Sequence, residues 1–434
     1  MDSGFALMDR AGVDPKHAVG REGWTAIKCS SKRAYGCGKG GNSAVQDLDL
    51  FVSHGDLENL SSALSVRAGD KVFRWIDKVI AEKGGDNDRY FRSKVEIVDK
   101  GLIVLTTSFS EYSGFDYYIV FDYFDGSLSM IPYLPDWATC YTTCPLPLRH
   151  HDGGYSLILF GGEFGYDGEG GNNLLWQWSP SWGASSDPWQ TRRLRLPAEM
   201  EGQFFSPDVL FSFNGFAFWT DLAIGTLCCH CSALLSEGHP LNFTFTELPP
   251  GYQLDRDDDD VLPVEVYRTM GCAGGSVKFI SIDKPCDGRG TRVKVWTLAP
   301  SRSEWKLYKD FRLKNLRKDF KSAGLPNNLP ICPMLREQED TTLYFIMPDQ
   351  ETRTMDWGHK YHLCRLDMPT KSLLQSKLLA HTTMDLDPVI LPSGFFDYLD
   401  PLPSSPETNN SSPETINSSP ETINSSPEIM LMEA

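Results

Sequence analysis

Residues 213–250, FNGFAFWTDLAIGTLCCHCSALLSEGHPLNFTFTELPP, carry the pattern that decides the fold. Side chains at 216–221 alternate between two faces, a turn containing Gly225 follows, and the alternation then resumes. After a polar loop, Phe243 and Phe245 alternate with threonines, and two prolines end the strand. The stretch predicts three short antiparallel strands, with Gly225 supplying a positive φ in the first turn.

Short strands separated by turns recur along most of the chain, which predicts an all-β protein. The pattern indicates strands within 94–109, 116–135, 155–163, 174–182, 275–283, 291–299, 303–311, 341–349, 361–368 and 372–380. One helix is expected at 72–84, where Val72, Ile76 and Ile80 have helical spacing and two glycines follow.

An aspartate followed six residues later by a leucine occurs at three predicted turns, starting at Asp122, Asp221 and Asp367. An aspartate at this position can accept hydrogen bonds from turn amides. The separations of 99 and 146 residues are near two and three multiples of about 49, close to the spacing of kelch-type blades. We therefore expect a β-propeller-like repeat domain of short antiparallel strands, with an open sandwich as the alternative.

Composition divides the chain into three parts. Residues 1–45 are rich in glycine and polar residues and are expected to form a flexible leader. Residues 46–395 hold the predicted strands and the short N-terminal helix. Residues 396–434 contain a Ser-Pro-Glu-Thr heptapeptide repeat, whose prolines and polar residues predict a disordered tail.

The formal net charge of -17 argues against a nucleic-acid binder and against attraction to an anionic membrane surface. No apolar run approaches the ~20 residues that span a bilayer, and no signal pattern begins the chain. We expect a cytoplasmic or nuclear protein that is not secreted. The odd count of eleven cysteines favours reduced thiols over a disulfide framework.

The motifs nominate neither a catalytic set, a cofactor site nor a metal site. Cys228–Cys231 is the densest group of soft ligands, but neighbouring residues of a strand point to opposite faces, so buried core cysteines are favoured over zinc. The acidic run at 255–260 lacks the ligand alternation of a calcium loop and is interpreted as a solvated loop. We therefore predict a protein that is not an enzyme.

Four tryptophans lie close together in the sequence, at Trp176, Trp178, Trp182 and Trp189. Two interpretations are open. Trp176 and Trp178 share a strand face, which is typical of core packing. Because tryptophan is enriched in binding hot spots, the four are also candidate partner-binding residues at a blade edge.

FAFWTDLAIGTLCCH followed by FTFTELP resembles the signature of a grass-expanded plant family of unknown function, number 1618 in the domain-of-unknown-function series. The residues that match are Trp219, Asp221, Leu222, Gly225, Leu227, Cys229, Leu248 and Pro249. His230 stands where this family usually has an aspartate. The similarity spans residues 50–382 and implies a β-propeller-like domain akin to those of plant F-box proteins, without an established activity. Residues 1–50 show no F-box.

These observations favour a non-enzymatic protein-interaction module of a plant cell, whose partner is another protein. Two alternatives stay open. One is an enzyme or small-molecule binder that uses a central propeller pocket, which converging polar groups would favour. The other is a degenerate F-box-type substrate receptor. The sequence does not indicate the oligomeric state.

Overall fold

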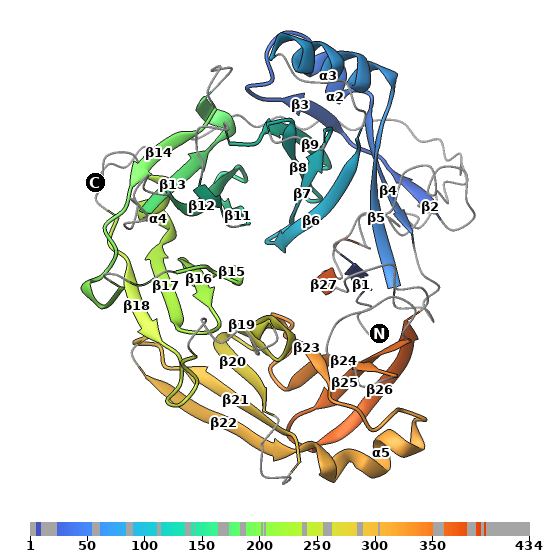
Figure 1. Cartoon of the computed structure of the whole chain (residues 1–434), viewed down its shortest axis with the longest axis vertical. Helices are drawn as coiled ribbons and strands as arrows, with labels where there is room; N and C mark the ends of the chain where they lie inside the picture. The colour runs from blue at the N-terminus through green and yellow to red at the C-terminus, as the bar shows by residue number, and fades with distance from the viewer. Residues whose placement is uncertain are drawn as a thin grey trace, which may run out of the picture. The chain divides into compact units, whose positions relative to one another are not determined.

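The computed structural model shows an all-β protein whose described strands form six small sheets arranged as the blades of a β-propeller (Figure 1). All six lie within residues 1–399, which form one compact unit. The structure describes residues 6–9, 24–53, 61–83, 90–110, 114–134, 140–142, 144–163, 173–182, 188–200, 203, 205–236, 241–254, 263–283, 290–302, 304–349, 360–379, 388–391 and 395.

Apart from β27 in blade 1, the strands of blades 1 to 3 come from the first half of the chain. Blade 1 has the strand order β2 (Trp24–Ile27), β4 (Leu48–Ser53), β5 (Ser61–Ala68), β1 (Ala6–Asp9) and β27 (Pro388–Leu391). Blade 2 has the order β3 (Ser31–Ala34), β9 (Ser127–Pro132), β8 (Asp116–Asp122), β7 (Leu102–Ser108) and β6 (Arg92–Asp99). Blade 3 consists of β10 (Cys140–Thr142), β11 (Leu146–Arg149), β12 (Tyr155–Glu163), β13 (Asn173–Trp178) and β14 (Gln190–Arg193).

Blades 4 to 6 are four-stranded meanders in sequence order. Blade 4 consists of β15 (Val209–Phe213), β16 (Phe216–Asp221), β17 (Gly225–His230) and β18 (Thr244–Glu247). Blade 5 consists of β19 (Arg268–Ala273), β20 (Ser276–Asp283), β21 (Arg292–Leu298) and β22 (Trp305–Arg312). Blade 6 consists of β23 (Ile331–Met334), β24 (Thr342–Pro348), β25 (Tyr361–Asp367) and β26 (Ser372–Leu379).

Helices are few and short among the described residues. The α-helices there are α2 (Gly41–Val45), α3 (Asp70–Glu82), α4 (Cys231–Leu235) and α5 (Arg317–Ser322). The 3₁₀ helices are η1 (Pro180–Trp182), η2 (Ala198–Met200), η3 (Val264–Val266) and η4 (Leu313–Leu316). The helix predicted at 72–84 is thus confirmed as α3. Its N-terminus is capped by the Asp47 carboxylate, which accepts a hydrogen bond of 2.9 Å from the Lys71 amide.

Blade 1 joins the two ends of the propeller domain. β1 pairs antiparallel with β27, so that Ala6 lies opposite Leu391, and it pairs in parallel with β5. A sheet shared between the first and last strands closes the ring of blades. Figure 1 shows β1 and β27 at the centre side of this blade.

The blades bury both of their faces, which explains apolar runs without alternation. In β7, Leu102 and Val104 belong to a cluster shared with blades 3 and 4, whereas Ile103 and Leu105 belong to one shared with blade 1 and α3. A strand packed on both faces gains stability from apolar side chains at every position. The core therefore lies between successive blades.

The hairpins expected from the sequence are confirmed. The segment 94–109 forms β6 and β7, and 116–135 forms β8 and β9 with the Asp125–Gly126 turn between them. All three turn aspartates accept a hydrogen bond from a turn amide: Asp122 from Phe124, Asp221 from Ala223 and Asp367 from Thr370.

The spacing inferred from those aspartates does not measure the blade repeat. Counted outward from the innermost strand, the turn lies between the third and fourth strands of blade 2 (β8 and β9) and of blade 6 (β25 and β26). In blade 4 it lies between the second and third strands (β16 and β17). The inner strands β15, β19 and β23 begin at residues 209, 268 and 331, so the blades are 59 and 63 residues apart. Loops of unequal length between strands explain why a 49-residue period was wrong.

The flexible leader predicted for residues 1–45 is wrong for its described part from Trp24 onward. β2 pairs with β4, β3 pairs in parallel with β9, and α2 buries Ala44 and Val45. The glycines between β3 and α2 suggested flexibility, but Gly36, Gly38 and Gly40 all have a positive φ and form a defined turn. The predicted disordered tail, 396–434, lies outside the described residues.

Candidate functional site

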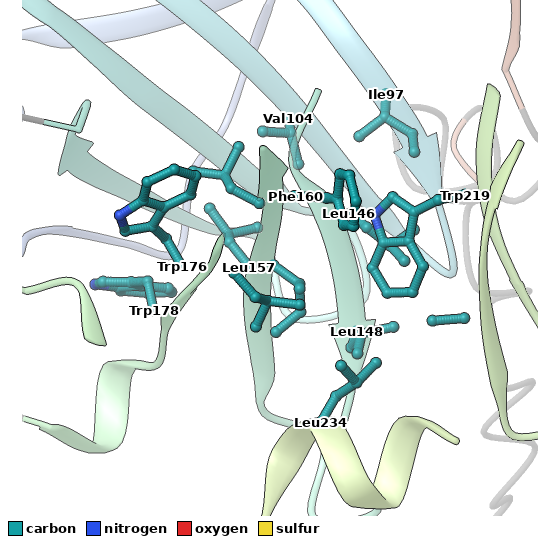
Figure 2. Close-up of a cluster of buried hydrophobic side chains, with 14 of the residues drawn as sticks. Ile97, Val104, Leu146, Leu148, Leu157, Phe160, Trp176, Trp178, Trp219 and Leu234 are labelled. Atoms are coloured by element: carbon teal, nitrogen blue, oxygen red, sulfur yellow. The ribbon is translucent and has the colours of Figure 1, made fainter. Parts of the chain in front are cut away.

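Trp219 and Asp221 of β16, the tryptophan-aspartate motif of blade 4, have a structural role. Trp219 is fully buried, with its ring 6.2 Å from that of Phe160 in blade 3 and 5.7 Å from that of Phe243. Figure 2 shows Trp219 beside Phe160 within the apolar cluster. The buried Asp221 carboxylate accepts hydrogen bonds from the backbone amides of Ala223, at 2.9 Å, and Ser206, at 3.2 Å. The motif therefore fixes the turn and the packing of blade 4 against blade 3.

Gly225 is required for a different reason from the one predicted. It does not have a positive φ; a Cβ at this position would instead lie 2.5 Å from the Phe245 ring and 2.6 Å from the Thr246 carbonyl oxygen. Close approach of β18, and not turn conformation, excludes a side chain here. The other residues of the motif are also buried: Leu222, Leu227, Cys229, Leu248 and Pro249.

The tryptophan patch proposed as a partner-binding edge is corrected by the structure. Trp176, Trp178 and Trp189 are each at most 5% exposed, so they belong to the core between blades. Figure 2 shows Trp176 and Trp178 in the apolar cluster. The Trp189 indole N–H donates a hydrogen bond of 2.9 Å to the Pro132 carbonyl of blade 2. Trp182, in η1, is half-buried. Of the two interpretations of Trp176 and Trp178, core packing is therefore the correct one.

The cysteine cluster also has a structural role. Cys228 and Cys229 are buried in β17, and Cys231 begins α4. Burial raises the pKa of the Cys229 thiol to about 11, which keeps it protonated at neutral pH. Among the residues that the structure describes, no group of three or more His, Cys, Asp or Glu side chains could hold a metal ion.

The structure brings polar groups together at the centre of the ring, where the sequence had nominated none. The inner strands β6, β15, β19 and β23 surround this centre in Figure 1, and they line a cavity of about 260 Å³. We call it the axial pocket. Its polar lining includes Asp99, Lys100, Ser212, Cys272 and Glu337, and its apolar lining includes Ile97, Phe211, Met270 and Leu335.

Two contacts cross the ring between blades that are not adjacent. The Ser212 hydroxyl of blade 4 donates a hydrogen bond of 2.7 Å to Asp99 Oδ2 of blade 2. The Lys100 ammonium of blade 2 forms an ion pair with the Glu337 carboxylate of blade 6. Because Glu337 and Lys100 are partly exposed, this pair lies where water reaches it and is weakened by salt.

The environment of the axial pocket shifts the proton equilibria of its side chains. Burial raises the pKa of Asp99 to about 6, with the Ser212 hydrogen bond and the Lys100 charge acting in the opposite direction. Burial also raises the pKa of the Cys272 thiol to about 11, and the nearby Glu337 carboxylate adds to this effect. At neutral pH Asp99 is therefore mostly ionised and Cys272 is a thiol.

Arg149, at the end of β11, positions the turn that carries Lys100. Its Nε donates to the Lys100 carbonyl at 3.1 Å, while its two terminal nitrogens bind the buried Asp122 carboxylate at 2.6 and 2.9 Å. Lys100 has a positive φ of 46°, a conformation that a non-glycine residue adopts only when its surroundings hold it. The bidentate pair thus connects blades 2 and 3 beside the axial pocket.

Sequence reasoning missed these residues because their partners are far apart along the chain. Ser212 and Asp99 are 113 residues apart, and Lys100 and Glu337 are 237 residues apart. Each is an ordinary polar residue at the end of a strand or in a turn. The available signal is positional: each lies near the C-terminal end of a strand that becomes the inner strand of its blade, or just after it.

The longest helix among the described residues is α3, with 13 residues. Over this part of the chain, none of the helices has both the length and the apolar composition needed to cross a membrane.

The fold and the axial pocket define a β-propeller with a polar centre. Residues 219–344 match the model of the family described as a protein of unknown function (DUF1618), which confirms the resemblance over these 126 residues. The match begins at Trp219 of β16 and ends at Tyr344 of β24. Plant origin and kinship with F-box proteins stay predictions. No curated protein matches the chain.

Several solved structures are similar at low identity. The β-propeller domain of Nup133 from Vanderwaltozyma polyspora is 10% identical, with a TM-score of 0.32, over 70% of this chain and 76% of that one. The β-propeller domain of the Trilobed protease from Pyrococcus furiosus is 8% identical, with a TM-score of 0.31, over 69% of this chain and 99% of that one.

An exo-beta-1,3-galactanase from Phanerochaete chrysosporium is also similar, at 6% identity and a TM-score of 0.31. That match covers 64% of this chain and 60% of the galactanase.

Proposed function

We propose that the protein is a binding module that holds a small molecule in the axial pocket. One observation carries the proposal: polar side chains from blades 2, 4, 5 and 6 converge on a cavity at the ring centre. Ligand pockets combine apolar walls with a few convergent polar groups and residues of perturbed pKa. The axial pocket has each of these properties, with a volume of about 260 Å³ just below the usual range.

The polar groups suit recognition better than packing between blades. Elsewhere, successive blades meet through apolar clusters such as the one around Trp176 and Trp219. At the centre, Asp99 and Ser212 keep hydrogen-bonding groups at the wall of an open cavity, beside the apolar Phe211 and Met270. A ligand with both polar and apolar parts matches such a wall.

Gly271 offers a direct test, because it lines the axial pocket and has an ordinary φ. A Cβ at this position would meet only the Leu335 side chain within 4 Å, at 3.9 Å, so Gly271→Leu should fill the cavity without displacing the backbone. The full chain is screened against a library of small polar compounds by ligand-observed NMR. Compounds that bind the unsubstituted protein should lose binding to Gly271→Leu and keep it with Lys306→Leu, which adds leucine on the exposed side of β22.

The proposal fails if the library gives no binder, or if binders are equally strong on Gly271→Leu. Thermal unfolding of both variants supplies the control for folding. An unchanged midpoint with lost binding supports the axial pocket as the site.

A protein partner is our second proposed function, and exposed leucines support it. Leu374 and Leu378 on the outer strand β26 are 51% and 44% exposed, and Leu307 on β22 is 49% exposed. An edge strand with exposed apolar side chains can pair with a strand of another protein. Cross-linking in cell extract should capture a partner that Leu374→Asp loses and Lys306→Leu keeps; equal capture by both variants would contradict this surface.

A further inference from the structure

We propose that the ligand of the axial pocket carries a positively charged ammonium or guanidinium group, with the Asp99 carboxylate as its counter-ion. This inference rests on the proposed function and names the chemical class of the ligand. It follows from which charges around the pocket already have partners.

Both cations that line the pocket are engaged by carboxylates. Lys100 forms its ion pair with Glu337. Arg336 forms an ion pair with Glu339, in which its Nη1 donates a hydrogen bond of 2.8 Å to Glu339 Oε1. The Tyr344 hydroxyl donates to the same carboxylate at 2.9 and 3.0 Å. An anionic ligand would have to compete with these internal carboxylates for either cation.

Asp99 has a different environment. Its carboxylate accepts a hydrogen bond of 2.7 Å from a neutral donor, the Ser212 hydroxyl. The Lys100 ammonium is paired with Glu337, so an ionised Asp99 has no ion-pair partner of its own among the described residues. A cation in the pocket would provide one, and a partly desolvated carboxylate attracts a cation more strongly than an exposed one does.

The apolar wall suits the rest of such a ligand. Phe211 is stacked on Phe218, with ring centroids 4.8 Å apart and planes within 7°, so its orientation is held by the core of blade 4. Met270 and Leu335 also line the pocket. An alkyl chain or a ring bearing an ammonium group could contact these side chains while its charge faces Asp99.

Protonation of Asp99 makes the binding dependent on pH. The titratable or charged groups near this carboxylate are Lys100, Glu337 and Tyr123 from turns, Cys272 from β19 and Cys231 from α4; burial raises the pKa of the Tyr123 phenol, so it stays neutral. Burial raises the pKa of both thiols to about 11, so they stay neutral between pH 5 and pH 8. Asp99, with a pKa of about 6, is the group that changes charge in this range. Cation affinity should fall about tenfold between pH 7.5 and pH 5, because only about a tenth of a group with this pKa is ionised at pH 5.

The test uses three probes of matched shape on the full chain: pentylammonium, pentan-1-ol and pentanoate, with agmatine as a guanidinium probe. Ligand-observed NMR titrations compare the unsubstituted protein with Asp99→Asn and Gly271→Leu. Asp310→Asn is the matched control, since it removes a carboxylate that pairs with Arg292 on the outer strands of blade 5.

We expect pentylammonium or agmatine to bind at least tenfold more tightly than the alcohol or the acid at pH 7.5. Asp99→Asn should weaken cation binding at least tenfold and remove its pH dependence, Gly271→Leu should abolish it, and Asp310→Asn should leave it unchanged. The pH titration of the unsubstituted protein provides an independent readout if Asp99→Asn disturbs folding.

The outcomes separate the two proposals. If pentanoate or pentan-1-ol binds as tightly as the cations and Gly271→Leu abolishes that binding, the pocket is a binding site but the inference about charge is wrong. If cation binding persists unchanged in Asp99→Asn, Asp99 is not the counter-ion. If the probes bind equally to Gly271→Leu, or do not bind at all, both the inference and the axial pocket as a binding site for such ligands are contradicted.

Discussion

The interface between blades 3 and 4 and the centre of the ring share blade 4 but have opposite chemistry. The interface is dry and aromatic, with Trp219 fully buried against Phe160. The centre holds an open cavity with Asp99 and Ser212 joined across it. Residues that stand out in the sequence thus stabilise the fold, whereas the residues that converge at the axis have no distinctive local pattern.

The sharpest way to test the structural side of this comparison is Trp219→Ala. Removing a fully buried indole leaves a cavity between two blades, and we expect a loss of about 3–5 kcal/mol in the free energy of unfolding. Chemical denaturation with fluorescence or circular dichroism measures the loss. Trp182→Ala, which removes a half-buried indole, is the matched control and should cost much less. Equal losses would show that the Trp219 side chain is not central to packing.

Two glycines provide a second, smaller contrast between the regions. Gly225→Ala places a Cβ within 2.6 Å of the Thr246 carbonyl oxygen and should destabilise the protein by about 1–3 kcal/mol. Gly271→Ala at the axial pocket meets only Leu335, at 3.9 Å, and should change stability by less than about 0.5 kcal/mol. Urea unfolding of the two variants measures both values. A neutral Gly225→Ala would contradict the close approach of β17 and β18.

The pH dependence of stability tests the polar centre. The pKa of Asp99 is raised to about 6 by burial, whereas an unfolded aspartate has a pKa of about 3.9. The folded state therefore binds more protons between these values, and Asp99 should lower stability as pH rises from about 4 to 6. Asp99→Asn should remove this slope, while Asp310→Asn should not. Unfolding midpoints across this pH window provide the measurement, and an unchanged slope in Asp99→Asn would contradict the environment assigned to Asp99.

The smallest expected effect belongs to the ion pair across the ring. Lys100 and Glu337 are 33% and 44% exposed at their side chains, so their coupling should be at most about 1 kcal/mol and should decrease with salt. A double-mutant cycle with Lys100→Met and Glu337→Gln at low and high ionic strength measures it. A coupling that is large and independent of salt would show that water does not reach the pair.

The comparison also explains what could be predicted from the sequence. Local patterns correctly predicted the hairpins of blades 2 and 4, helix α3 and the burial of Cys228 and Cys229, because these depend on neighbours a few residues away. They could not predict the closure of blade 1, since the paired residues Ala6 and Leu391 of β1 and β27 are 385 residues apart. The turn role of Gly225 was predicted wrongly because β18, which approaches it, follows only after a loop.

The axial pocket could not be predicted from the sequence either, because its residues also come from distant parts of the chain. Asp99 becomes unusual only when blade 4 brings Ser212 to within hydrogen-bonding distance and the folded ring partly desolvates its carboxylate. The tryptophans at 176, 178 and 189 were conspicuous by composition, yet their surroundings place them in the core. Residue type alone therefore pointed to the wrong candidate surface.

The most direct test of the central claim is a paired measurement on Gly271→Leu in the full chain. We predict that this variant unfolds at the same temperature as the unsubstituted protein but no longer binds small molecules that the unsubstituted protein holds. Retained binding at full affinity, in a variant whose cavity is filled, would contradict the account of the ring centre as the functional site.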